Sequence, residues 1–214
     1  MTTDSAAAVS RKRASERTVE RGSQHPSGSA TLSRENLQER TILRLKRGGW
    51  RDPDVLLVRC AGGLAVVKDF APRGRFVRWV LGPRAIRREV AALRRLAGHA
   101  SVPQFLGCLD SLACTIEHRG GPRLSRRRPW TFSPEFARRL RLAVSRMHAC
   151  GIAHLDLSHR SNVHSDMSGQ PVLVDFASAV ALEPESIAHR LVWPLLVRVD
   201  ERALRKWESW LSES

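Results

Sequence analysis

The order of strand-like and helix-like segments predicts an α+β protein. The first half of the sequence reads as paired strands with one helix, and the second half reads as mainly helical with one hairpin. A chain of 214 residues with 42% hydrophobic residues can bury one good core, or one domain in two small lobes. We therefore expect a two-lobed α+β domain, with a small β-rich first lobe and a reduced helical second lobe.

The first segment, residues 1–38, is rich in Ser, Ala, Arg and Gly and has almost no large apolar side chains. Such a segment cannot bury enough surface to offset the entropy lost on ordering. We predict a disordered basic tail over 1–38, a first lobe over 39–119, and a second lobe with a C-terminal helix over 120–214.

The first lobe contains four short apolar segments and one helical pattern. The apolar segments read as strands and lie at 55–59, 64–70 and, near LDS, at 103–109 and 112–117. The first two are joined by AGG as a hairpin, and an arginine-rich loop follows them. Residues 85–98 then show helical spacing, which Gly98 ends.

The second lobe opens with a helix and continues with a hairpin. Ser133-Pro134-Glu135 is a good N-terminal capping sequence, and the helix is expected to end before Cys150. Its apolar face is formed by Phe136, Leu140, Ala143, Val144 and Met147. NVHS and VLVDFA flank a turn, which predicts a second hairpin.

The C-terminal tail, residues 183–212, alternates Arg with Leu, Val and Trp at roughly helical spacing. A short lobe cannot leave so many large apolar side chains in solvent. We therefore expect the following side chains to be buried: Leu191, Val192, Leu195, Leu196, Leu204, Trp207 and Trp210.

The charge balance points to phosphate-bearing partners. The formal net charge is +15, and only four of the 36 basic residues are lysine. Such a field attracts nucleotides, nucleic acid or an anionic membrane, although arginines that only fill solvated faces would give the same count. A nucleic-acid binder would usually interleave aromatics with its arginines. Because the chain has no tyrosine, we do not expect nucleic acid as a partner.

The four cysteines have no CxxC spacing, so we expect reduced thiols in a cytoplasmic protein. No apolar signal segment is visible near residue 1. The longest apolar stretch late in the chain, LVWPLLV (191–197), is too short to span a bilayer. A soluble protein is expected, with peripheral contact at the inner face of the membrane as an alternative.

Lys68 is unusual because most basic residues of this chain are arginine, and no other lysine lies between Lys46 and Lys206. A compact ammonium on a flexible stem suits a point contact to phosphate oxygens. Glu89 falls within the apolar arc of the predicted helix, and a carboxylate there requires a partner. We expect Lys68 to be that partner. The alternatives are a lysine that reaches solvent at a strand edge, and a Glu89 paired with a neighbouring arginine.

HLDLSHRSN (154–162) and VDFA (174–177) bring Asp156, Asn162 and Asp175 close together in sequence. Asp156 could accept a proton from a hydroxyl nucleophile. Asn162 and Asp175 flank the two strands of the predicted hairpin, and amide and carboxylate oxygens are hard ligands suited to Mg²⁺. These residues indicate metal-assisted phosphoryl transfer. The alternative is a purely structural role, in which they cap ordinary turns.

Together, AVVK, Glu89, HLDLSHRSN and VDFA resemble the protein-kinase-like superfamily. Among its members the sequence is most similar to the small atypical kinases, the RIO kinases and the bacterial lipopolysaccharide (Kdo/heptose) kinases. The resemblance spans roughly 42–212 and implies a minimal two-lobed kinase fold.

The resemblance also implies a role for each residue. Lys68 would contact the α- and β-phosphates of ATP and Glu89 would brace it, while Asp156 would act as the base. Asn162 and Asp175 would hold Mg²⁺. The hinge that holds adenine through its backbone would be Ile116, Glu117, His118 and Arg119.

The sequence departs from the family pattern in four places. No G-x-G-x-x-G is present, and LKRGGW (45–50) is the only candidate to cover phosphates. Asn162 lies six residues after Asp156 rather than five, so that loop must bulge. Asp175-Phe176-Ala177 replaces DFG and loses the conformational freedom of glycine. Only about 37 residues follow Ala177, too few for an activation segment and a large peptide-binding lobe.

The sequence therefore predicts an ATP- and Mg²⁺-dependent kinase that phosphorylates a hydroxyl group on a protein or on an envelope glycolipid sugar. The alternative is a non-catalytic or ATPase-only nucleotide switch of the same fold, which docks protein or nucleic acid. The missing glycine-rich loop favours the alternative, and the joint presence of all five polar residues favours the enzyme.

Overall fold

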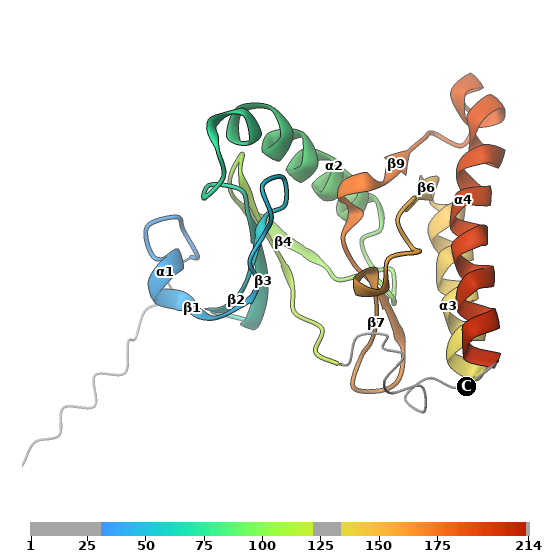
Figure 1. Ribbon diagram of the computed structural model, residues 1–214, viewed down its shortest axis with the longest axis horizontal. Coiled ribbons are helices and arrows are strands. Elements are labelled where there is room, and N and C mark those ends of the chain that lie inside the picture. The colour runs from blue at the N-terminus through green and yellow to red at the C-terminus, as the bar shows by residue number, and fades with distance from the viewer. Residues whose placement is uncertain (1–30, 122–133, 213–214) are drawn as a thin grey trace, which may run out of the picture. The chain divides into compact units, whose positions relative to one another are not determined.

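The computed structural model describes residues 31–121 and 134–212, which form a mixed α/β fold (Figure 1). This agrees with the predicted α+β class. Five strands form an antiparallel sheet in the order β1-β2-β3-β5-β4. The strands are β1 (Thr41–Lys46), β2 (Asp54–Cys60), β3 (Gly63–Asp69), β4 (Phe105–Asp110) and β5 (Ala113–Glu117). The predicted strands correspond to β2 through β5, whereas β1 escapes prediction because arginine and lysine interrupt its apolar pattern.

Side chains along each strand alternate between the two faces of the sheet. One face carries a cluster of buried apolar residues: Leu37, Leu56, Val58, Ala65, Val67 and Ala113. Against the other face lies α2 (Gly82–Arg95), whose Ile86 and Val90 pack with Phe70 and Cys114. Each face of the sheet therefore has its own apolar cluster.

The boundary predicted at residue 38 is too late. Residues 1–30 lie outside the described part of the chain, but 31–40 pack on the sheet. Leu37, the first residue of the short helix α1 (Leu37–Arg40), is buried with Leu56 and Val58. Arg34 lies 2.7 Å from Asp69 and 2.7 Å from Asp110. A few large side chains thus anchor a segment whose average composition predicts disorder.

The helix predicted over 85–98 begins earlier and ends earlier. A π-helical turn, Val77–Leu81, leads directly into α2 at Gly82, where an arginine-rich loop was expected. Pro83 occupies the first turn of α2, a position that proline favours. The helix ends at Arg95, and Gly98 follows with φ +80°, in the left-handed region that glycine adopts without strain.

The part of the chain after residue 133 is built on two long helices, α3 (Pro134–Ala149) and α4 (Ile187–Ser212), which lie side by side (Figure 1). Short strand pairs lie between them in sequence: β6 (Ile152–Ala153) with β9 (Val180–Ala181), and β7 (Val163–Ser165) with β8 (Pro171–Leu173). The β7–β8 pair is the predicted hairpin. Ser133, the predicted helix cap, lies outside the described residues.

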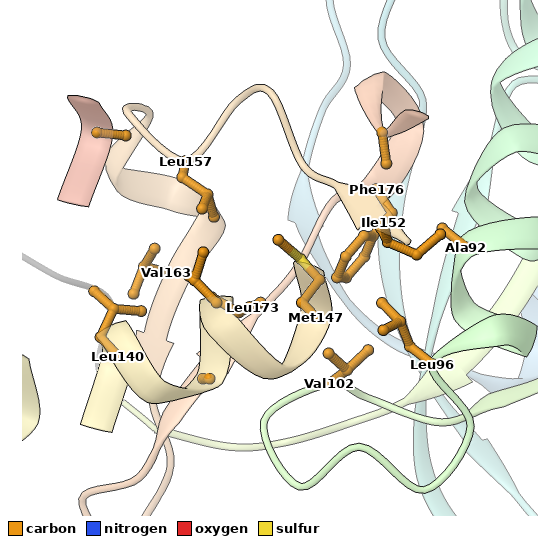
Figure 2. Close-up of a cluster of buried hydrophobic side chains, with 14 of the residues drawn as sticks. Ala92, Leu96, Val102, Leu140, Met147, Ile152, Leu157, Val163, Leu173 and Phe176 are labelled. Carbon is orange, nitrogen blue, oxygen red and sulfur yellow. The ribbon is translucent and has the colours of Figure 1, made fainter. Parts of the chain in front are cut away.

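The largest apolar core joins α2 to this second part of the chain. All five side chains predicted to line one face of α3 are buried: Phe136, Leu140, Ala143, Val144 and Met147. Figure 2 shows Met147 near Ile152 and Phe176, with Leu96 from the turn after α2 beside them. Because these side chains come from distant segments, the core fixes the turns that carry the candidate site.

The prediction of a buried C-terminal tail is half wrong. Leu204 and Trp207 are buried, and Leu196 is half-buried, but Leu191, Val192 and Leu195 are exposed. The Trp210 side chain lies outside the described residues. His148, near the end of α3, contacts both Trp193 and Asp200, so α3 lies against one side of this part of α4 and leaves the other side uncovered. Among the described residues, no helix is long and apolar enough to cross a membrane.

Candidate active site

Lys68 lies at the centre of a group of charged side chains. Its Nζ is 2.6 Å from Oε1 of Glu89 and 2.7 Å from Oδ1 of Asp175. Lys68 and Glu89 are buried, whereas 43% of the Asp175 side chain is exposed. The predicted pairing of Lys68 with Glu89 is confirmed. Neither alternative, a lysine at the solvent edge or a Glu89 paired with arginine, is found.

The electrostatics of this group favour the charged forms of Lys68 and Asp175. Burial lowers the pKa of Lys68, but the charges of Glu89 and Asp175 outweigh burial and raise the pKa above its ordinary value. The charge of Lys68 holds the pKa of Asp175 below its ordinary value, against the opposing effect of burial. At neutral pH the site therefore contains a permanent cation beside a permanent, half-exposed anion.

Two elements and one turn meet at Lys68. The residue lies on the face of β3 that is turned toward α2, and Glu89 is one of the buried residues of α2. Burial raises the pKa of Glu89, and the nearby backbone of Phe176 opposes that rise, because α2 packs against the turn that follows Asp175. Glu89 therefore positions both the lysine and the turn.

Asp156 and Asn162 form a second group. The Nδ2 of Asn162 donates to the Asp156 backbone oxygen at 2.9 Å and to Asp156 Oδ2 at 2.7 Å. The N–H of Val174 donates to the Asn162 carbonyl at 3.0 Å, so Asn162 lies against the residue before Asp175. A short 3-10 turn, Arg160–Asn162, takes up the extra residue in this loop. Asn162 therefore contacts Asp156 directly and reaches Asp175 through the backbone of the preceding residue, Val174.

Two strained backbone conformations lie in the turns that carry Asp156 and Asp175. Among the described residues, two non-glycine residues have φ in the left-handed region: Leu155 at 66° and Asp175 at 70°. One precedes Asp156 and the other is itself a predicted site residue. Such conformations cost about 1–3 kcal/mol each and collect at functional sites, where the surrounding structure enforces them. Their location supports a functional role for these turns rather than simple capping.

Asp200 of α4 is a residue of this site that the sequence analysis missed. It has no exposed surface, and its two carboxylate oxygens accept the backbone N–H groups of His154 and Leu155, each at 2.8 Å. Oδ2 also lies 2.9 Å from Nε2 of His148. Asp200 thus fixes the strained turn just before Asp156. An acidic residue at a buried position of a helix was the available signal, as it was for Glu89.

His154 supports the turns from behind. It is fully buried, its Nε2 lies 3.1 Å from the carbonyl oxygen of Val174, and its ring packs at 4.8 Å from that of Phe176. Burial lowers the pKa of His154, so the ring is neutral at neutral pH. A neutral His154 joins the segment before Asp156 to the segment before Asp175.

The sheet presents an apolar row beside Lys68, which the sequence analysis also missed. Leu43 pairs with Leu57, Leu57 with Val66, and Val66 with Ile116 across four neighbouring strands. Directly paired residues point to the same face of a sheet, and this is the face that carries Lys68, two residues along from Val66. Leu43 is exposed, and Leu57 and Val66 are half-buried. The sequence alone could not reveal this row, because it depends on which residues pair across neighbouring strands. The outermost of these strands, β1, was not predicted.

The predicted hinge lies at the end of this row. Ile116 is buried in β5, and the N–H of Glu117 is already donated to the Gln104 carbonyl at 2.8 Å. Arg119 donates through Nε to Glu117 Oε2 at 3.1 Å. Among the described residues, no backbone hydrogen bond is formed by 118–121. Backbone contacts to a base would therefore fall just after Glu117 rather than on Ile116 or Glu117.

The donor atoms at Asp175 and Asn162 fit a hard cation such as Mg²⁺. Asp175 uses Oδ1 for Lys68, and within the described residues its Oδ2 accepts no hydrogen bond. The amide oxygen of Asn162 accepts only a 3.1 Å hydrogen bond from the Ser161 hydroxyl. Within 31–121 and 134–212 no three His, Cys, Asp or Glu side chains are grouped to hold a metal. Mg²⁺ needs few protein ligands, because phosphates and water supply the others.

No protein-family model matches the chain, and no curated protein matches it. The candidate site therefore rests on its residues and their geometry.

Proposed function

We propose that this protein is an ATP- and Mg²⁺-dependent kinase with a minimal two-lobed protein-kinase-like fold. The observation that carries the proposal is Lys68, a buried lysine held between Glu89 and Asp175 beside a partly exposed apolar row. A fixed cation next to apolar surface matches the phosphates and the base of a nucleotide. The β-rich part before residue 119 and the helical part after it would be the two lobes.

In this proposal each charged residue has a distinct task. Lys68 contacts the α- and β-phosphates, and its ion pair with Glu89 keeps the ammonium in place when Asp175 turns to a new partner. Asp175 and Asn162 would hold Mg²⁺, which when bound neutralises phosphate charge. Leu43, Leu57 and Val66 cover one face of the base, and the backbone after Glu117 meets its polar edge.

Asp156 is the base. Its carboxylate takes the proton of the acceptor hydroxyl as the hydroxyl oxygen attacks the γ-phosphorus. The new P–O bond forms to the acceptor, the bond from the γ-phosphorus to the bridging oxygen breaks, and ADP leaves with that electron pair. The hydrogen bonds of Asn162 to Asp156, and those of Asp200 to the preceding turn, hold the carboxylate in one orientation.

The outer face of α4 bears on the identity of the acceptor. Ile187, Leu191 and Leu195 are exposed at four-residue intervals, and the exposed Arg198 and Arg202 continue the same side of the helix. Neither arginine forms an ion pair with another described residue. Apolar side chains beside unpaired cations are typical of surfaces that meet anionic lipid. This favours an envelope glycolipid sugar over a free protein as the acceptor.

The test is transfer of labelled γ-phosphate by the full-length protein in the presence of Mg²⁺. Reactions would contain a protein fraction, anionic vesicles that carry glycolipid, or no acceptor. We expect label in the glycolipid fraction. Asp156→Asn should lower transfer by roughly 10²–10⁴-fold while ATP affinity is retained. Asp175→Asn should instead weaken ATP binding in Mg²⁺, because one hard ligand loses its charge.

A matched control makes the same change elsewhere. Asp166→Asn, in the β7–β8 turn, should leave both ATP binding and transfer unchanged. Release of free phosphate without acceptor labelling would favour the ATPase-only switch, and ATP binding without turnover would favour the non-catalytic switch. A wild-type protein that binds no nucleotide would show that the proposal is wrong.

A further inference from the structure

Lys46, the last residue of β1, lies in the same cross-strand row as Lys68. Lys46 pairs with Val55 of β2, and Val55 pairs with Lys68 of β3. Because directly paired residues point to the same face of the sheet, both lysine side chains are on the face where Asp175 lies. The charge of Lys46 contributes to the low pKa of Asp175, which agrees with this placement.

The ammonium of Lys46 is available for a ligand. Its side chain is 51% exposed, and its ion pair with the exposed Asp52 is long, at 3.5 Å. An exposed pair of this kind contributes little and is easily exchanged for a better partner. Among the three lysines in the described part of the chain, Lys206 lies on α4, and the other two lie on this face of the sheet.

The backbone N–H of Gly48, in the turn after Lys46, is already engaged inside the protein. The N–H of Gly48 donates to the buried Asp54 at 2.9 Å, and Arg73 also contacts Asp54. A Cβ on residue 48 would lie 2.3 Å from the backbone oxygen of Asp52, so only glycine fits there. Gly48 is therefore required for close packing of the turn, and its N–H, bonded to Asp54, is not free to bind a phosphate.

We propose that Lys46 forms a phosphate-binding subsite, which contacts the β,γ end of a nucleoside triphosphate and replaces the absent glycine-rich loop. This inference rests on the proposed function, in which Lys68 contacts the α,β end. Cross-strand spacing of about 4.8 Å separates the two lysines by about 10 Å at the backbone, and their flexible stems can converge on one triphosphate. A single ammonium can follow the γ-phosphate oxygens as they move during transfer, which a rigid guanidinium cannot.

The experiment measures the affinities of ATP and AMP for the full-length protein by calorimetry with Mg²⁺. Lys46→Gln should weaken ATP binding about 10- to 100-fold, the loss expected for one charge-assisted phosphate contact. AMP binding should change less than about twofold, because AMP lacks the phosphates that Lys46 reaches. Lys206→Gln removes the same charge from an exposed lysine on α4 and is the matched control; it should leave ATP affinity unchanged.

Three results would overturn the inference. ATP binding by Lys46→Gln equal to that of the wild type, with Lys68→Met impaired, would remove Lys46 from the site but leave the proposed function standing. Equal losses of affinity for ATP and AMP would mean that Lys46→Gln disturbs the fold or the binding of the nucleotide base, not a contact with the β- and γ-phosphates. Equal losses in Lys46→Gln and Lys206→Gln would indicate that ATP responds to the overall positive charge of the protein rather than to Lys46. Failure of the proposed function differs from all three, since the wild type would then bind no nucleotide.

Discussion

At the scale of single residues, the site depends on carboxylates that have no solvent to stabilise them. Glu89 and Asp200 are both buried, and each is paired with donors from a distant segment: Glu89 with Lys68, and Asp200 with the N–H groups of His154 and Leu155. A buried charge is tolerated only when such partners are present. The two carboxylates therefore constrain where Lys68 and Asp156 can lie.

The Lys68–Glu89 pair can be tested by a double-mutant cycle. Lys68→Met and Glu89→Gln should each lower ATP affinity and turnover, because the first leaves the buried Glu89 without its cation and the second leaves Lys68 with Asp175 as its only charged partner at this site. The double variant should lose less than the sum of the single losses. Calorimetry and an initial-rate assay measure both quantities. Fully additive losses would contradict functional coupling across the 2.6 Å contact.

Asp200→Asn should damage turnover more than ATP binding. The asparagine amide would face an N–H donor, and a buried donor left unpaired costs about 1–3 kcal/mol. The turn before Asp156 would loosen, while Asp175 and Lys68 lie on other segments. We expect a lower kcat with a nearly unchanged KM for ATP, and a lower Tm. Glu201→Gln, at the next, half-buried residue, is the control; equal effects of the two changes would argue against a positioning role for Asp200.

At the scale of elements, each helix has a different relation to the core. The apolar face of α3 is buried along its length, whereas the fully buried side chains among those described on α4 are Asp200, Ala203, Leu204 and Trp207. The Nε1 of Trp207 donates to the Leu157 carbonyl at 2.8 Å, so α4 contacts the segment just after Asp156. The helices therefore support the turns of the site through a few buried positions.

Two leucines of α3 test this packing. Leu140 is 1% exposed and Leu142 is 50% exposed on the same helix. Leu140→Ala should lower the free energy of unfolding by about 2–5 kcal/mol, because it leaves a cavity in the core. Leu142→Ala should change it by less than about 1 kcal/mol. Urea unfolding of both variants measures the difference, and similar losses would mean that the core does not lie against this face of α3.

At the scale of the whole molecule, the folded unit begins before the predicted boundary. Arg34 bridges Asp69 of β3 and Asp110 of β4, and Leu37 fills the apolar cluster on the face of the sheet opposite Lys68. Before Thr31 the sequence has only Met1, Val9 and Val19 as large apolar side chains. The boundary of the folded unit therefore lies near residue 31, because the sequence before it has few large apolar side chains to bury.

Two truncations follow from this boundary. Deletion of residues 1–30 should leave the free energy of unfolding and ATP turnover nearly unchanged. Deletion of 1–38 should lower the free energy of unfolding by about 2 kcal/mol or more, because the burial of Leu37 is lost and Asp69 loses its partner. Chemical denaturation of both proteins gives the comparison. A large loss on deletion of 1–30 would mean that the tail contributes to the fold.

The sequence by itself determined the elements whose signals are local. The β2–β3 and β7–β8 hairpins follow from apolar runs around turn residues, and α3 follows from its apolar period. Lys68 and Glu89 could be paired from sequence because a carboxylate within an apolar helical arc requires a cation, and this chain offers one lysine nearby.

What only the tertiary structure decided depends on contacts between distant segments. Strand register places Lys46 in the same cross-strand row as Lys68 and completes the apolar row from Leu43. Leu191 and Leu195 are exposed, although their spacing matches that of core residues. Asp200 reaches the turn before Asp156 from 45 residues away. Local periodicity states which side chains share a face, but burial depends on which partner covers that face, and long-range packing sets that partner.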